Sequence, residues 1–467
     1  MSTINPKHGT ANSSVGYGKA SSAVIQPAKT GFQLGQYTIP FPNAIDIRSF
    51  VHIGDSRTAQ IYLTGTYKSS VHWFNAANAL MGQSMKIAGN FGISAKRTDE
   101  YFNANLLSAL ATNAGWLVIG MPAVNDIAQA ATPYVNQNGV TVNLSNVAQV
   151  AFANIAAAAL MALSAGKRVI INAEPGGTSM TPAMVGQVFE LNQRLREFCE
   201  NTAGCHFLDL ASVSWNPTNS ATALAFKTGY SLDGTHYSTL GAYYQGKAFK
   251  AFIQSFVPPF EQACANVAEV SGTWSSALLL NPLFQTLTGG TISGGIALSS
   301  GSVPANMTVT GAATSSVAIT SAPEPNGFGN TVTFTITGSA ADTVMIQWNA
   351  PSSSLWSLTD IFQGGVTASV AAGSSNAAIM FCNQINTDKG TLEQYDMYCA
   401  RGGSTTGSGP TEAYSYTLAS APSGVMAGST SKGYLAPRLY VVLNAAGNAT
   451  VTLSRAWFRK RYSLLTS

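Results

Sequence analysis

The periodicity of the chain changes at Pro258-Pro259, and this change limits what the chain can fold into. Before the two prolines, short apolar runs rich in β-branched residues alternate with segments that have helical spacing. After them, short alternating runs are separated by Gly, Ser, Asn and Pro, and helical spacing is almost absent. The first pattern predicts a parallel sheet covered by helices on both faces. The second predicts an antiparallel β-sandwich.

The expected elements of the first part follow from these patterns. Strands are expected at residues 50–53, 116–120, 168–172 and 206–210, and a strand followed by a loop at 86–92. Helices are expected to open at 58 and at Ser94-Ala95, and to span 147–163, 184–200 and 239–252. In the second part, strands are expected at 331–336, 343–348, 377–381, 413–418, 438–443 and 449–453.

A serine lies in the turn between an expected strand and an expected helix. Gly54-Asp55-Ser56-Arg57 follows the apolar run 50–53, with Gly54 relieving crowding, so Ser56 is expected at the carboxyl edge of the sheet. A hydroxyl there lies near helix N–H groups that bind developing negative charge. Taken alone, the tetrapeptide favours a helix-capping role for Asp55 or Ser56.

A late segment, Asp233-Gly234-Thr235-His236, favours catalysis instead. One turn of chain can bring the carboxylate onto the imidazole, which fixes the ring tautomer and leaves the other nitrogen free to accept the serine proton. Among the five histidines, His236 is the one with an acid three residues upstream. His52 lies in an expected buried strand and is interpreted as a core histidine.

An oxyanion donor is expected from the middle of the chain. Asn125 closes the loop 121–125 after the expected strand 116–120, where its side-chain amide can point to the same edge as Ser56. A turn or helix-cap asparagine is an equally good interpretation of Asn125 alone. The backbone N–H groups around Ser94-Ala95 are expected at that edge too.

Together these segments resemble the motifs of the SGNH, or GDSL-type, hydrolases, over residues 46–256. The motifs are Gly-Asp-Ser, an Asn-x-Gly-x-Ser-Gly-like stretch, a Gly-x-Asn-Asp stretch and a late Asp-x-x-His. The resemblance implies a three-layer α/β/α flavodoxin-like domain that hydrolyses esters or thioesters without a metal or cofactor. By position, Ser56 would be the nucleophile, Asp233 and His236 its partners, and Asn125 the side-chain oxyanion donor.

This sequence departs from the family pattern at three places. The oxyanion glycine falls on Ala95, whose N–H is expected to serve only if φ is negative there. Residues 120–124 differ from the usual Gly-x before Asn-Asp, and Arg57 replaces the usual leucine. Arg57 is open to two interpretations, a reader of anionic substrates or a solvated helix residue, and the second is favoured. Further along the chain, Glu174-Pro175-Gly176-Gly177 is expected at a strand end, where it would wall the substrate cleft.

The sandwich part is similar to jelly-roll carbohydrate-binding modules, with residues 280–284 resembling their first strand. Its aromatic residues have two interpretations, as platforms for sugar rings or as core, and core is favoured because aromatics carry much of the buried area of a sandwich. They are Trp274, Trp348, Trp356 and Tyr395.

Composition narrows the setting of the chain. Only 9% of its 467 residues are charged, against ~25% in ordinary globular proteins, and the net charge of +4 is too weak and scattered for nucleic-acid binding. A basic cluster near the C-terminus (Arg455, Arg459, Lys460 and Arg461) is expected on a last strand, as a docking or subunit contact. No run approaches the ~20 apolar residues of a membrane span, so no membrane partner is expected.

The expected organisation is an N-terminal arm at 1–44, a hydrolase domain at 45–260 and a sandwich at 261–467. The arm lacks the apolar core of a signal peptide and is expected to order on a partner. Five cysteines show no metal-ligand spacing; Cys199 and Cys205 are close enough to pair, but free buried thiols are favoured.

These expectations converge on a serine esterase acting on a carbohydrate, such as an O-deacetylase of bacterial surface polysaccharide. Low charge, the arm and the all-β C-terminal part resemble bacteriophage tail or receptor-binding proteins. The expected location is then the virion, or else the extracellular space. Expected partners are a glycan substrate, other virion proteins contacted through the arm or C-terminus, and further copies of the chain. The alternative is a virion structural or adhesion protein with a vestigial hydrolase fold.

Overall fold

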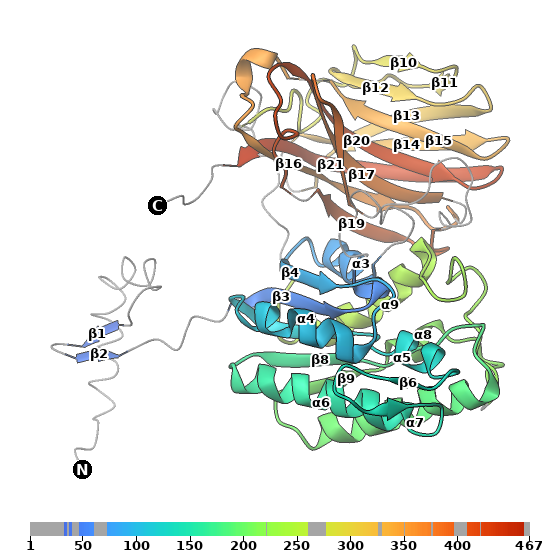
Figure 1. The fold of residues 1–467 in the computed structure, drawn as a ribbon. Coiled ribbons are helices and arrows are strands. Elements are labelled where there is room, and N and C mark those ends of the chain that lie inside the picture. The colour runs from blue at the N-terminus through green and yellow to red at the C-terminus, as the bar shows by residue number, and fades with distance from the viewer. Residues whose placement is uncertain are drawn as a thin grey trace, which may run out of the picture.

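The computed structural model shows two packed domains (Figure 1). It describes residues 46–59, 72–220, 222–259, 277–325, 329–349, 351–374, 377–396, 409–420 and 422–461. In the expected arm it gives the backbone of one antiparallel pair, β1 (Phe32–Leu34) and β2 (Tyr37–Ile39). The rest of the arm, Trp274, Cys264 and Cys399 lie outside the described residues.

A five-stranded parallel sheet forms the centre of the first domain. Its strand order is β4-β3-β5-β8-β9, so the first strand of the sheet lies between the second and the third. This 2-1-3-4-5 order is the flavodoxin-like arrangement. The strands are β3 (Asp46–Gly54), β4 (Lys86–Gly92), β5 (Ala114–Gly120), β8 (Arg168–Asn172) and β9 (Cys205–Leu208).

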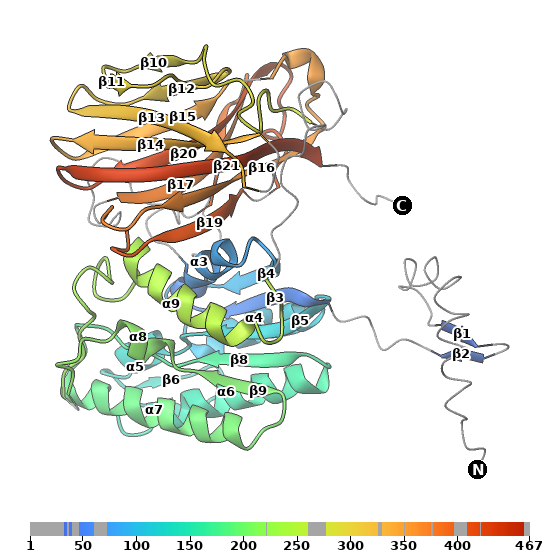
Figure 2. The ribbon, with the colours of Figure 1, turned by 180° about the vertical axis from the view of Figure 1, so that it is seen from behind.

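Helices cover both faces of this sheet, which confirms the expected three-layer α/β/α architecture (Figures 1 and 2). Alternate strand residues point to opposite faces. Val51, Leu117 and Ile171 pack with one helical layer, whereas Phe50, Trp116 and Ile170 pack with the other. The first layer is α4 (Thr98–Leu110), α6 (Val147–Ser164) and α7 (Pro182–Glu200); the second is α3 (Trp73–Leu80) and α9 (Thr239–Ile253).

Short elements connect these layers. They are α2 (Ser56–Ala59), α5 (Val124–Gln129), α8 (Leu210–Ser214), β6 (Tyr134–Val135) and β7 (Thr141–Val142). Among the described helices, α6 is long and apolar enough to cross a membrane by length and composition. Ala151, Ile155 and Ala158 on α6 are buried in the domain core, as in a core helix of a soluble domain.

Two six-stranded sheets face each other in the second domain. Their strand orders are β10-β12-β15-β20-β17-β18 and β11-β13-β14-β21-β16-β19. The eight consecutive strands from β14 to β21 are divided between the two sheets, in the orders β14-β21-β16-β19 and β15-β20-β17-β18. This division is the jelly-roll topology. The expected antiparallel sandwich is therefore confirmed, with parallel pairs at β10–β12 and β11–β13.

The expected runs at 331–336, 343–348 and 413–418 agree with strands to within two residues, whereas β17, β20 and β21 extend well beyond theirs. The strands are β10 (Thr291–Ser293), β11 (Ala297–Ser300), β12 (Met307–Thr310), β13 (Ser315–Pro323), β14 (Asn330–Gly338), β15 (Asp342–Trp348), β16 (Ile361–Val370), β17 (Ala377–Thr387), β18 (Gly390–Asp396), β19 (Tyr414–Ala419), β20 (Lys432–Leu443) and β21 (Gly447–Arg461). The basic cluster does lie on the last strand, β21.

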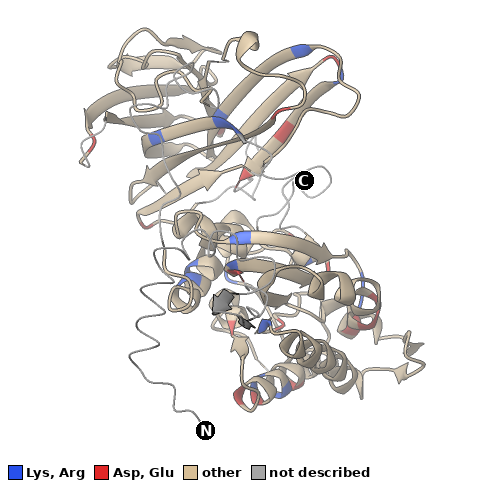
Figure 3. Cartoon of the chain, turned by 90° about the vertical axis from the view of Figure 1, so that its left-hand side faces the viewer, with Lys and Arg blue, Asp and Glu red and all other residues tan. Residues whose placement is uncertain are grey.

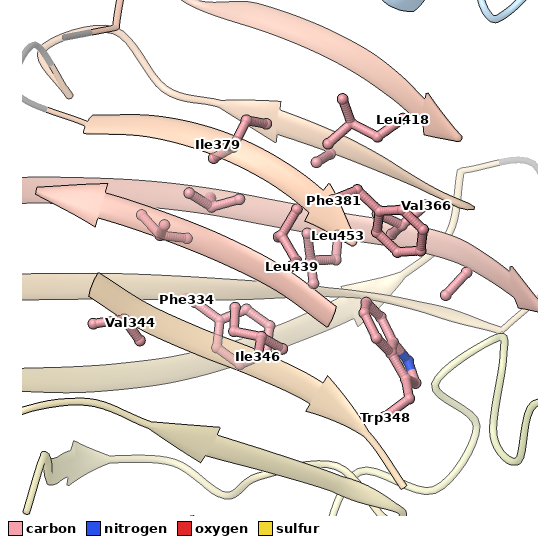
Figure 4. Packing of buried hydrophobic residues seen from close by; sticks show 14 of the residues in the cluster. Phe334, Val344, Ile346, Trp348, Val366, Ile379, Phe381, Leu418, Leu439 and Leu453 are labelled. Carbon is pink, nitrogen blue, oxygen red and sulfur yellow. The ribbon is translucent and has the colours of Figure 1, made fainter. Parts of the chain in front are cut away.

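The two inner faces of the sandwich interdigitate in one apolar core (Figure 4). Phe334, Ile346 and Phe381 are fully buried there. Trp348 and Trp356 are also buried in this core, and Tyr395 is buried in a smaller cluster, so the core interpretation of these aromatics is confirmed.

Residues 280–284 do not form the strand that their sequence suggested. Asn281 and Phe284 have φ of 53° and 50°, and this left-handed backbone makes a turn in which Phe284 N donates to Asn281 O. The Asn281 side chain closes the turn by donating to the carbonyl oxygen of Thr286. A strand is excluded because left-handed residues break the extended backbone that strand pairing needs.

Helix α3 lies against strand β19 of the sandwich and also packs on α9, which crosses one face of the parallel sheet (Figure 2). Ala76 and Tyr243 from these helices belong to the same apolar cluster as the sandwich core. Polar bonds add to this junction: Gln83 Nε2 donates to Thr417 O at 2.7 Å, and Tyr243 Oη donates to Glu412 Oε1 at 2.7 Å. The hydrolase-like domain thus shares a buried layer with the sandwich.

Candidate active site

The turn after β3 holds Ser56 at the carboxyl edge of the sheet. Gly54 ends the strand, and a Cβ added there would lie 2.3 Å from Thr58 Oγ1, so the turn is too tight for a side chain. Asp55 Oδ1 accepts the Arg57 N–H at 2.9 Å and closes the turn. Ser56 then opens α2 with its hydroxyl directed to the edge.

The three residues expected to form a catalytic unit do converge. Ser56 Oγ lies 2.9 Å from His236 Nε2, although 180 residues separate them in sequence. On the other side of the ring, His236 Nδ1 lies 2.7 Å from Asp233 Oδ2. This is the geometry in which a carboxylate fixes the imidazole tautomer and the imidazole accepts the serine proton.

Asp233 is anchored by its own turn. Its Oδ1 accepts the backbone N–H groups of Thr235 at 2.9 Å and His236 at 2.8 Å. Partial burial raises the pKa of this half-exposed carboxyl, but the hydrogen bonds from His236 and Thr235 outweigh it and leave the pKa below its ordinary value of 3.8. The carboxylate is therefore ionised at neutral pH and accepts from the His236 ring.

The expected oxyanion donors line the same cavity as Ser56 and His236. This cavity has a volume of about 510 Å³ and includes Ala95 and Asn125 in its wall. Asn125 lies in the first turn of α5 rather than in a loop, and its Nδ2 donates to Lys96 O at 3.1 Å. Because an amide nitrogen carries two hydrogens, one remains to donate to a reacting oxygen.

Ala95 has φ of +62°, which contradicts the expected condition of a negative φ. Its backbone takes the left-handed conformation that a glycine adopts freely, so a glycine at this position would fit the observed turn. An alanine in this conformation costs about 1–2 kcal/mol. The expected helix start at Ser94-Ala95 is also wrong, because α4 begins at Thr98.

Asp126 explains where α4 begins, and sequence reasoning gave it no role. Its two oxygens accept Thr98 N at 3.0 Å and Thr98 Oγ1 at 2.6 Å, which satisfies the first turn of α4. This contact ties the Asn125 helix to the loop that contains Ala95. Burial raises the pKa of Asp126 to about 7, with the Thr98 bonds acting in the opposite direction.

The expectation that Arg57 is solvated is wrong. Its side chain is 3% exposed and Nη1 lies 2.7 Å from Oε1 of the fully buried Glu174. Burial raises the pKa of the adjacent Asp55 carboxyl to about 7, although the Arg57 charge lowers it. Of the segment expected to wall the cleft, Gly177 lines the cavity, while Glu174 lies buried behind it.

The remaining expectations about histidines and cysteines are met where the structure describes them. His52 is buried in β3, and burial lowers its pKa well below its ordinary value. His72 caps α3 by accepting the Phe74 N–H at Nδ1. Cys199, Cys205 and Cys382 are free and buried, with the first two sulfurs 2.9 Å apart.

Comparison with known proteins gives a family for the first domain. Residues 52–243 match the GDSL-like Lipase/Acylhydrolase family. No curated protein matches the sequence.

Solved structures also resemble parts of the chain. A proposed acylhydrolase from Bacteroides fragilis is 19% identical, covering 47% of this chain and 91% of its own, with a TM-score of 0.34. An acetylxylan esterase from Geobacillus stearothermophilus is 14% identical over 47% of this chain and 97% of its own, with a TM-score of 0.31. The active domain of tailspike protein 4 of bacteriophage CBA120 is 14% identical, over 33% of this chain and 19% of its own, with a TM-score of 0.23. These TM-scores carry no inference about substrate or setting. Ser56, Asp233 and His236 all lie within the residues 52–243 that match the GDSL-like Lipase/Acylhydrolase family.

Proposed function

We propose that this chain is a serine esterase that removes O-acetyl groups from a polysaccharide. The observation that carries the proposal is the hydrogen-bonded series Ser56, His236 and Asp233 at the mouth of a cavity of about 510 Å³. A hydroxyl, a base and an orienting carboxylate in contact are what acyl transfer through a serine ester requires.

The reaction proceeds in two halves. Ser56 Oγ attacks the acyl carbon while His236 Nε2 accepts its proton, and the imidazolium then donates that proton to the departing sugar hydroxyl. Water, deprotonated by His236, attacks the Ser56 ester and releases acetate. The N–H groups of Asn125 and Ala95 hydrogen-bond the oxyanion in both halves, and one such donor is typically worth ~10²–10³ in turnover.

The wall of the cavity supports a small acyl group. Apart from the reacting residues, one part of the wall is apolar and another carries uncharged hydroxyls. The apolar part is Val124, Ala128, Met180 and Met184, and the hydroxyls are those of Ser94, Ser179 and Thr235. Such a wall accepts a short alkyl group and offers no charged partner to an acidic one. Acetyl is the smallest group of this class.

A carbohydrate as the alcohol part is supported by the sandwich. On β14 the outward residues Thr331, Thr333, Thr335 and Thr337 alternate with buried apolar ones. Hydroxyls of neighbouring strands continue this face, with Thr333 Oγ1 2.8 Å from Thr452 Oγ1. Beside α3, this face lines a groove of about 510 Å³. The groove also contains Glu324 and Arg455, which lie 3.9 Å apart as a pair of opposite charge. Hydroxyls in such density beside a neutral pair suit a neutral glycan better than a charged partner.

The proposed setting is a bacteriophage virion, with the N-terminal arm or the C-terminus joining other virion proteins. Few charged residues lie on either domain (Figure 3), in line with the 9% of charged residues in the sequence. This low charge supports the proposed setting. The alternative is a virion adhesion protein with a vestigial site. The Ser56–His236 contact and the cavity beside it support turnover over this alternative.

Release of acetate from O-acetylated bacterial surface polysaccharide tests the proposal. We expect the full chain to release acetate, and Ser56→Ala to release less than a thousandth as much. Arg196→Gln is the matched control, because Arg196 is an exposed residue of α7 that pairs with Asp209. Equal release by the wild type and Ser56→Ala would refute the assignment, and turnover of p-nitrophenyl acetate without release from any polysaccharide would refute the substrate.

A further inference from the structure

Two buried charges beside the site have no part in the reaction as derived above. Arg57 follows the nucleophile directly, and Glu174 comes 117 residues later, after β8. Their side chains are 3% and 0% exposed. Removing two charges from water costs about as much as their attraction returns, so a buried ion pair is a poor source of stability. Its position beside Ser56 calls for another explanation.

The Arg57 guanidinium donates to three different segments. Nη1 binds Glu174 Oε1 at 2.7 Å, Nη2 binds Gly176 O at 2.6 Å, and Nε binds Thr235 O at 3.1 Å. Thr235 precedes the base His236 in the chain, and Gly176 precedes Gly177 in the cavity wall. One side chain beside the nucleophile therefore holds the loop of the base.

Glu174 extends these links to the oxyanion side. Its Oε2 accepts the Ala123 N–H at 2.9 Å, and Ala123 caps α5, whose second residue is Asn125. Its Oε1 accepts the Gly176 N–H at 2.7 Å as well as the Arg57 bond. The Asn192 side chain of α7 in turn bonds both the N–H and the C=O of Glu174. The pair thus joins the segments that follow β3, β5 and β8 to the loop between α8 and α9.

We propose that Arg57 and Glu174 are positioning residues that hold nucleophile, base and oxyanion donor in register. This inference rests on the hydrolytic function proposed above. The planar fork of Arg57 can donate in three directions at once, which a leucine at this position cannot do. Since small misplacements of reacting groups can cost ~10² in rate, loss of these bonds should lower turnover rather than binding.

Glu174→Gln is the first test. The amide keeps the size of the carboxyl but has one oxygen, so it can accept either from Ala123 N–H or from Arg57 and Gly176, and its NH₂ group faces the remaining donor. We expect kcat for p-nitrophenyl acetate to fall about 10- to 100-fold with KM changed less than threefold. Unchanged kcat in a folded Glu174→Gln protein would overturn the inference.

Arg57→Lys tests the geometry of the fork. Lysine keeps the positive charge beside Glu174 but cannot reach Gly176 O and Thr235 O together. We expect kcat to fall about tenfold while Arg196→Gln retains the wild-type value. Full activity in Arg57→Lys would show that charge alone suffices and would contradict the positioning role.

The double variant Arg57→Met with Glu174→Met separates positioning from folding. It removes both charges, and buried ion pairs replaced in this way often leave a protein equally stable. We expect a thermal midpoint near that of the wild type with kcat still reduced at least tenfold. A kcat within threefold of wild type would show that the pair is only structural. If the wild-type chain itself lacks turnover, the proposed function fails; if wild type is active and these variants are too, only this inference fails.

Discussion

The two domains bury polar groups in different ways. In the α/β domain, charged side chains are buried around the site, including Asp55, Arg57, Asp126 and Glu174. In the sandwich the central core is apolar, and the polar side chains of strands such as β14 are hydroxyls on the outer face. Its buried carboxyls Glu324 and Asp396 lie in the groove beside α3 and at the junction with the α/β domain. Each buried charge needs its own hydrogen-bond partners, and these bonds fix the positions of the segments around the candidate site in the α/β domain. The sandwich is stabilised mainly by the apolar area that it buries.

The carboxyl groups show the same contrast. Burial raises the pKa of both Asp55 and Asp126 from 3.8 to about 7. In the sandwich, the N–H groups of Ser431 and Thr430 lower the pKa of the exposed Asp388 from 3.8 to about 2. Thus burial holds Asp55 and Asp126 at a cost in stability, whereas hydrogen bonds hold Asp388, like Asp233 of the first domain, at a gain.

The largest effect is expected from His236. His236→Ala removes the base of the site, and the loss of one member of such a unit lowers kcat by ~10⁴ or more. The ring is partly exposed, so the free energy of unfolding should change by about 1 kcal/mol or less. Ester hydrolysis and urea denaturation, measured on the same protein, check both halves. Retention of a tenth of the wild-type activity would exclude His236 as the base.

For the core of the sandwich we expect a large effect on stability and none on kcat. Phe381 is fully buried in the core shown in Figure 4. Phe381→Ala should lower the free energy of unfolding by about 3–5 kcal/mol and leave kcat unchanged below the unfolding temperature. Thr335→Val on the outward face of β14 is the matched control, with an effect below about 1 kcal/mol. A large fall in kcat in folded Phe381→Ala would contradict the expectation that the sandwich core affects stability and leaves turnover unchanged.

Stability against pH should depend on the α/β domain. Between the ordinary pKa of 3.8 and the folded value of about 7, folded Asp55 holds more protons than unfolded Asp55, so stability falls as pH rises through that window and is constant above it. Asp55→Asn removes this loss of stability. At ~1.4 kcal/mol per pH unit, the loss is at most about 3 kcal/mol between pH 5 and pH 8. Urea denaturation at both pH values measures it.

Asp388→Asn is the control for this slope. The lowered pKa of Asp388 gives stability that is present above about pH 4 and is lost as pH falls toward 2. Its substitution should therefore leave the difference between pH 5 and pH 8 unchanged. Equal slopes in the wild type and Asp55→Asn would contradict the raised pKa of Asp55.

The smallest effect is expected at Ala95. Ala95→Gly relieves the left-handed alanine but adds chain entropy to the unfolded state, so stability should rise by at most about 1 kcal/mol. The N–H stays in place, and kcat should remain within about twofold. Thermal denaturation and ester hydrolysis check this, and a tenfold change in kcat would mean that the Ala95 methyl group contacts substrate.

The sequence was sufficient for the catalytic residues because each has a local signal. Gly54-Asp55-Ser56 lies at a strand-to-helix turn, and Asp233-Gly234-Thr235-His236 lies in the loop before α9; a 2-1-3-4-5 sheet brings such segments to one edge. The two-part organisation followed equally from the change of periodicity at Pro258-Pro259.

The errors lie where a distant partner decides the outcome. Arg57 looked solvated because its partner Glu174 is 117 residues away, and α4 starts at Thr98 because Asp126 caps it from another helix. Strand β16 was not predicted, since Gly364-Gly365 breaks its alternation; both glycines pack closely against Phe458 or Trp457 of β21. None of these contacts can be predicted from the residues on either side of the position in the sequence.

Labelling with a small alkyl fluorophosphonate, followed by mass spectrometry of the digested protein, tests the central claim most directly. If the Ser56 hydroxyl is activated by His236, one phosphonyl group per chain should appear on Ser56, and its formation should be at least a hundredfold slower in His236→Ala. A folded, wild-type chain that stays unlabelled, or carries its label on another residue, would contradict the account.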